Sequence, residues 1–213
     1  MRRLISLLVL IHALEGAVIL DRIAVIVGKH VIKISDIERD VRLTDFLNRQ
    51  PLEFSAEQKR KSAERLIDQE IIRQEIITGG YRRAAESDAA KLEADVVRDR
   101  FHGSEAQFHE ALARYGLTGD QLRAQLLWQL TVLQFIDERF RVGVFVSDDE
   151  IRAYYDQHQA ELRRENPKDS SFAALQAKIR SSLEGEQVNQ NFNAWLEESR
   201  KRYRIEYKQE AFT

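Results

Sequence analysis

Five copies of one helix-start signal constrain this chain more than any other feature of its sequence. Each copy is a Ser or Thr followed three residues later by Glu or Gln, and each opens an amphipathic stretch. In such a capping box the two side chains bind backbone N–H groups that the first helical turn leaves without partners. One match would be a weak signal, because these residue types are common, but five together favour a helical domain. The pairs are Ser35/Glu38, Ser55/Gln58, Ser104/Gln107, Thr118/Gln121 and Ser147/Glu150.

The apolar periodicity that follows these signals predicts seven helices. Glycines mark several of their ends, as expected for helix C-termini. The chain also has only nine glycines and two prolines among 213 residues, which favours long helices over a turn-rich β fold. Residues 141–146, "RVGVFV", are expected to be extended. The predicted helical ranges are 36–48, 56–78, 88–101, 105–115, 119–140, 148–161 and 172–201.

Short strands are predicted at both ends of the same helical region. Residues 22–34, "RIAVIVGKHVIKI", are rich in β-branched residues and are interrupted by a Gly-Lys-His turn, which is typical of a hairpin. Residues 203–208, "YRIEYK", alternate between apolar and charged side chains, as in a half-buried strand. Because an isolated hairpin is marginal in water, we expect residues 204–207 to pair with residues 23–27. The predicted fold is therefore mainly α, with a small sheet that joins the two ends.

The first seventeen residues have the layout of a secretory signal peptide. Arg2 and Arg3 precede an apolar run over residues 4–14, and the small residues Gly16 and Ala17 follow. The run is too short for a comfortable transmembrane span. We therefore expect export, with residues 18–213 as the mature chain. There are two alternatives. The signal could remain uncleaved and tether the chain to the inner membrane, or these residues could form a short buried helix with no targeting role.

Composition excludes several kinds of chemistry. The chain has no cysteine, which removes thiol catalysis, disulfides and cysteine-based metal sites. The formal charge of −2 gives no attraction to nucleic acid, and the basic run 200–204, "RKRYR", is expected to complement a helix dipole. His30, His102, His109 and His158 form no pair at metal-ligand spacing. No catalytic residue, metal or cofactor is predicted.

Apolar side chains in the middle of the chain are the candidate binding residues. In residues 119–140 they spread beyond one helical stripe, so this helix is either buried on most sides or faces a groove. Aromatic and aliphatic residues also gather in residues 101–117. They form either ordinary core or an exposed apolar surface, which in a soluble protein marks a binding site. The candidates are Phe101, Phe108, Leu112, Tyr115, Leu117, Trp128, Phe135 and Phe140.

Several segments, in order, carry a resemblance to a known family. They are "LDRIAVIVGKHVIKISDIERDV", "RLIDQEIIRQEI", "FHEALARYGLTGDQLRAQLLWQL" and "VSDDEIRAYYDQH". Together they resemble the N-terminal domain of SurA-type periplasmic chaperones, and residues 172–207 resemble that family's C-terminal helix and strand. PrsA-type foldases and the chaperone domain of trigger factor share related architecture. The resemblance implies an exported protein that binds unfolded polypeptide clients, mainly outer-membrane proteins.

One departure from the family decides the expected activity. Members usually carry parvulin prolyl-isomerase domains between the "SDDEI" helix and the C-terminal helix, where this chain has only the polar residues 158–171. Compact domains need at least about 50 residues. We therefore expect residues 18–157, a short linker at 158–171 and residues 172–208 to form an ATP-independent holdase without enzymatic activity. A helical adaptor that docks on one fixed envelope partner is the alternative, and a prolyl isomerase is the least favoured.

Overall fold

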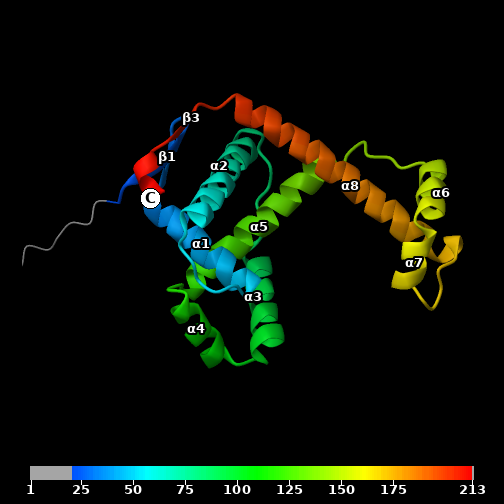
Figure 1. The fold of residues 1–213 in the computed structure, drawn as a ribbon, viewed down its shortest axis with the longest axis horizontal. Coiled ribbons are helices and arrows are strands. Elements are labelled where there is room, and N and C mark those ends of the chain that lie inside the picture. The colour runs from blue at the N-terminus through cyan, green and yellow to red at the C-terminus, as the bar shows by residue number, and fades with distance from the viewer. Residues whose placement is uncertain (1–20, 213) are drawn as a thin grey trace, which may run out of the picture.

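The computed structural model describes residues 21–212, which form a mainly α-helical fold with one small sheet, as predicted (Figure 1). The proposed signal peptide, residues 1–17, lies outside the described residues. Three of the predicted helices, 56–78, 119–140 and 172–201, have the observed bounds. The elements are β1 (Ile23–Val27), β2 (His30–Lys33), α1 (Ile34–Asn48), α2 (Ala56–Thr78), α3 (Glu86–Phe101), α4 (Glu105–Arg114), α5 (Gly119–Phe140), α6 (Asp148–Gln157), α7 (Gln159–Glu165), α8 (Phe172–Lys201), β3 (Ile205–Tyr207) and the 3₁₀ turn η1 (Gln209–Ala211).

The sheet joins the two ends of the described chain. Its strand order is β2-β1-β3, and both pairings are antiparallel. β1 pairs with β3 through Val25 opposite Tyr207 and Val27 opposite Ile205, which confirms the predicted long-range pairing. Gly28 turns the hairpin with a φ of 59°, a left-handed conformation that glycine adopts without strain. The backbone N–H of Gly28 also donates to the carbonyl of Arg204 at 2.9 Å.

Two clusters of buried side chains build the body of the molecule. In the first, the inner face of β1 packs on α2, and Phe212 from the C-terminal end closes the cluster. In the second, α1, α3, α4 and α5 pack around Phe46, Phe108 and Leu122. Each cluster buries the apolar stripe of amphipathic elements that could not be stable alone.

The long helix α8 connects this body with a second, smaller lobe (Figure 1). At its N-terminal end α8 packs with α6 and α7 around Ile151, Leu162 and Ile179. Further along, Val188 of α8 packs against the ends of α2 and α5. Arg200, near the C-terminus of α8, forms ion pairs with Glu64 and Asp68 of α2. α8 thus carries the chain back from the small lobe to the sheet.

Two of the five predicted capping boxes are complete, and two more have only the serine half of the box. Ser55, Ser104, Thr118 and Ser147 each accept a hydrogen bond from the backbone N–H three residues later. The bond is returned by the side chains of Gln121 and Glu150, which complete the last two boxes.

The prediction for Ser35 was wrong. The helix α1 begins at Ile34, directly after β2, and Asp36 accepts from the backbone N–H of Lys33 at 3.0 Å. Ser35 therefore lies inside the first turn, and its hydroxyl donates to Asp21 at 2.5 Å. Because no loop separates the strand from the helix, the cap falls earlier than the sequence pattern indicated.

The segment expected to be a polar linker is partly helical. The helix predicted over 148–161 ends at Gln157, and residues 159–165 form α7. His158 lies at the junction with φ −110° and ψ 16°, and one of its ring nitrogens lies 2.9 Å from the Tyr154 carbonyl. Leu162, an isolated apolar residue, is buried against α6 and α8. Burial of this one side chain holds a helix in an otherwise polar stretch.

Candidate functional site

Five of the eight predicted binding residues are buried in the structure. Phe108, Leu112 and Leu117 lie in the cluster of α1, α3, α4 and α5. Phe135 and Phe140 lie between α5, α2 and α8. Phe135 and Phe140 are covered because α5 packs against α3 on one side and against α8 on another, so its apolar residues are buried around more than one stripe. For these five side chains the structure thus decides between the two alternatives: they are core residues rather than an exposed apolar surface.

The other three candidates are partly buried, and the structure does not bring them together as one site. The Phe101 ring packs edge-on against Phe108, with centroids 5.6 Å apart. The Tyr115 hydroxyl donates to the carbonyl of Gln50 at 2.8 Å, and its ring packs against Phe46. Phe101 and Tyr115 line one shallow pocket of about 370 Å³, whereas Trp128 lines a different and larger groove.

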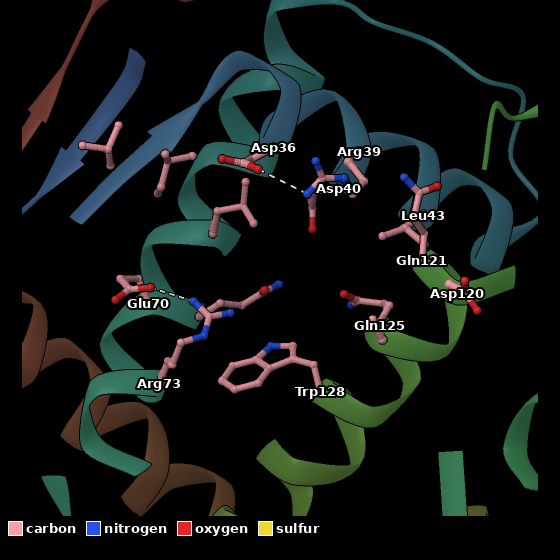
Figure 2. Close-up of a pocket in the computed structure, with 15 residues that line it drawn as sticks. Asp36, Arg39, Asp40, Leu43, Glu70, Arg73, Asp120, Gln121, Gln125 and Trp128 are labelled. Carbon is pink, nitrogen blue, oxygen red and sulfur yellow. Dashed lines mark hydrogen bonds and ion pairs between the residues drawn. The ribbon is translucent and has the colours of Figure 1, made fainter. Parts of the chain in front are cut away.

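The larger groove lies between α1, α2 and α5, with β2 at one end, and we call it the α1–α2–α5 groove (Figure 2). It consists of two neighbouring depressions of about 590 and 540 Å³. Four residues line both depressions and so form the waist between them. They are Asp40, Gln69, Gln125 and Trp128.

Apolar side chains line a large part of this groove. Trp128 projects from α5 across the floor, and the guanidinium of Arg73 lies 4.8 Å from the centroid of its ring (Figure 2). Such a cation–π contact holds the indole in one orientation. Leu133, which lines the second depression, is 63% exposed. The remaining apolar lining consists of Val31, Ile32, Leu43, Leu47, Leu66, Ile72, Ala124 and Val132.

Most of the charges inside the groove are paired with one another; the exception is Asp120, which is exposed at the start of α5 and lies 3.8 Å from Arg123, outside the groove. Carboxylates and guanidiniums alternate along α1 and α2, and three close pairs neutralise the lining. Glu70 has further partners, because its other contacts are to Gln74 at 2.7 Å and to His30 at 3.1 Å. The three pairs are Asp36–Arg39 at 3.2 Å, Asp40–Arg65 at 2.5 Å and Glu70–Arg73 at 2.6 Å.

The polar residues that line the groove recur at regular spacing in the sequence, a pattern that could have predicted them. Arg65, Gln69 and Arg73 recur at four-residue spacing on α2, and Gln121, Gln125 and Gln129 do so on α5. Residues four apart share one helix face. A polar stripe beside an apolar one on two long helices could therefore have indicated two faces that meet across a groove.

A metal site or a membrane span would each require particular features of the described residues. Within residues 21–212, no group of three or more His, Asp or Glu side chains is arranged to hold a metal ion. His102 ends α3 in a left-handed conformation, and His109 is exposed beside Glu105. No helix in the described part of the chain has the length and apolarity needed to cross a membrane.

No family model matches this chain, and no curated protein matches it in sequence.

Proposed function

We propose that this protein is an ATP-independent chaperone of the periplasm that holds unfolded exported proteins, in particular outer-membrane proteins, and has no enzymatic activity. The observation that carries the proposal is the open α1–α2–α5 groove, in which apolar side chains alternate with charges that are already paired. The resemblance to SurA-type chaperones supports the client class.

Groove chemistry of this kind suits transient binding. Burying about 100 Å² of apolar client surface contributes about 2.5 kcal/mol, and much of this is offset by the loss of client conformational freedom. Several such contacts together hold an unfolded segment, yet each can be broken without nucleotide hydrolysis. Because the groove's own ion pairs stay intact, no buried charge has to find a new partner when the client leaves.

The segment 158–171 supports the expectation that the protein is not a prolyl isomerase. It forms α7 and a short loop before α8, in the interval where parvulin domains are usually inserted in the resembled family. The proposal therefore places the function in the groove of the body rather than in a catalytic domain at this position.

The proposal is tested by aggregation suppression and site-specific crosslinking. An outer-membrane β-barrel protein is diluted from urea with the full chain at low molar excess, and light scattering is expected to fall. A photocrosslinking residue in place of Leu133 is expected to capture the client. The same residue in place of Gln107, which is exposed on α4 outside the groove, serves as control. Unchanged scattering together with equal crosslinking at both positions would overturn the proposal.

A second candidate function is a helical adaptor for one fixed envelope partner. Val142 and Phe145, in the connection between α5 and α6, are 83% and 74% exposed, and neither lines the groove. An adaptor predicts a stable stoichiometric complex in crosslinked envelopes, lost in a Val142→Ser/Phe145→Ser variant. A chaperone predicts many unrelated precursors, and their capture is expected to survive this double substitution.

A further inference from the structure

Two glutamines at the waist of the α1–α2–α5 groove have side-chain amides without a hydrogen-bond partner among the described residues. Gln69 comes from α2 and Gln125 from α5, and each lines both depressions. Both side chains are half-buried. Figure 2 shows Gln125 projecting from α5 into the space above Trp128. Neither amide is sealed from solvent in the free protein, but a client that covers the waist takes both from water and must then supply their hydrogen bonds.

The neighbouring polar groups already have partners. Asp40 accepts from Arg65, and Glu70 accepts from Arg73 and Gln74. Gln121, one turn before Gln125, accepts from the backbone N–H of Thr118 as part of the capping box. At the waist, Gln69 and Gln125 therefore keep both the donor and the acceptor of their amides available to a ligand.

A glutamine amide has the same groups as a peptide unit. It offers a carbonyl acceptor and an NH₂ donor. An extended polypeptide presents backbone C=O and N–H groups along its edges that are not used within the segment. Two amides on opposite walls can bind such a segment whatever its side chains are, while Trp128 and its apolar neighbours contact those side chains.

We propose that Gln69 and Gln125 bind the main chain of an extended client segment whose central residues are uncharged. This inference rests on the proposed chaperone function and names the feature of the client that the groove recognises. The segment is uncharged because the carboxylates at and beside the waist are already paired, Asp40 with Arg65 and Glu70 with Arg73. A client charge placed there would lose its hydration without gaining a counterion.

The test uses backbone esters, which remove N–H donors and leave the side chains unchanged. A fluorescent, capped peptide of about ten alternating valines and threonines is compared with two analogues, in which esters replace either the odd or the even backbone amides. Binding to the full chain is measured by anisotropy. At least one analogue is expected to bind about 2- to 12-fold more weakly for each hydrogen bond lost.

Variants assign this difference to the two glutamines. Methionine has a similar length and helix propensity but no amide, so Gln69→Met/Gln125→Met is expected to weaken parent binding and to remove the discrimination between parent and ester. Gln107→Met on α4 is the matched control and is expected to keep both. A peptide with a central lysine or glutamate is expected to bind more weakly than the neutral parent.

The possible outcomes separate this inference from the function on which it rests. If the parent and both analogues bind equally while aggregation is still suppressed, main-chain recognition is overturned and the chaperone proposal stands. Retained discrimination in the double methionine variant overturns the assignment to Gln69 and Gln125. If no peptide binds and aggregation is not suppressed, both proposals fail.

Discussion

Phe135 and Leu133 lie two positions apart on α5 and have opposite environments. Phe135 is fully buried, and its ring contacts Tyr81, Phe140 and Trp195, with centroids 4.9 to 5.7 Å away. Leu133 is 63% exposed at the groove. Positions two apart on a helix point about 200° apart. The residue type therefore does not decide whether an apolar side chain of α5 serves the core or a binding surface.

Substitution of these two residues is expected to separate stability from binding. Phe135→Ala removes a fully buried ring and is expected to lower the free energy of unfolding by about 3–5 kcal/mol. Leu133→Ala alters an exposed side chain. It is expected to change the free energy of unfolding by less than about 0.5 kcal/mol and to weaken client binding. Urea denaturation measures the first effect and peptide anisotropy the second. Equal destabilisation by both substitutions would contradict the assignment of Leu133 to the surface.

At the scale of elements, the capping box at the start of α6 affects the pKa of one of its members, Glu150. The Ser147 hydroxyl and backbone N–H donate to the carboxylate of Glu150 at 2.7 and 2.8 Å. These bonds hold the pKa of Glu150 below its ordinary value of 4.5. A carboxyl whose pKa is lowered by folding binds protons more weakly in the folded state. Its stabilising contribution is therefore present above pH 4.5 and is lost as the pH falls through the folded-state pKa.

Ser147→Ala is expected to raise the pKa of Glu150 towards 4.5, because the hydroxyl is the largest cause of the shift. The side-chain carboxyl resonance of Glu150, followed by NMR from pH 2 to pH 7, measures this change. Glu57 is the control, because its pKa is lowered by Lys61 and has no connection with Ser147. An unchanged Glu150 titration in the variant would show that the box does not form in solution.

At the scale of the whole molecule, the N-terminal and C-terminal segments of the described chain pack against each other. The β1–β3 pairing and the ion pairs of Arg200 with α2 bring the C-terminal part back to the N-terminal hairpin. The loop before α8 lies in the small lobe, far from this closure (Figure 1). A change in the length of that loop therefore does not disturb the contacts that hold the body together.

Insertion of about ten Gly and Ser residues between Lys168 and Asp169 is expected to leave the fold intact. Both positions are exposed, and each doubling of a flexible loop costs only about 0.6 kcal/mol. The same insertion between Gly28 and Lys29 separates the two strands of the hairpin and is expected to be strongly destabilising. Circular dichroism during urea denaturation compares the two variants. Loss of the body's helices after the 168/169 insertion would contradict closure by the ends.

Local signals in the sequence were sufficient for the elements and for the class of the fold. The bounds of α2, α5 and α8 follow from caps at Ser55 and Thr118 and from apolar periodicity, which act within a few residues of each helix end. The pairing of β1 with β3 was also predictable, because two short strands need a third partner and residues 203–208 offered a suitable one. Caps and periodicity depend on residues a few positions away, whereas this long-range pairing was predictable because a lone hairpin needs a further strand.

Only the tertiary structure decided which apolar residues are core and where the groove lies. Phe108, Leu112 and Phe135 looked like Trp128 in the sequence. In the structure α1, α3 and α5 cover the first two and α2 and α8 cover Phe135, whereas Trp128 lies beside an open groove. The two walls of the groove come from α2 and α5, whose glutamines are 56 positions apart in the chain. Exposure of a side chain depends on which helices pack over it, and that packing is a property of the assembled elements rather than of any one of them.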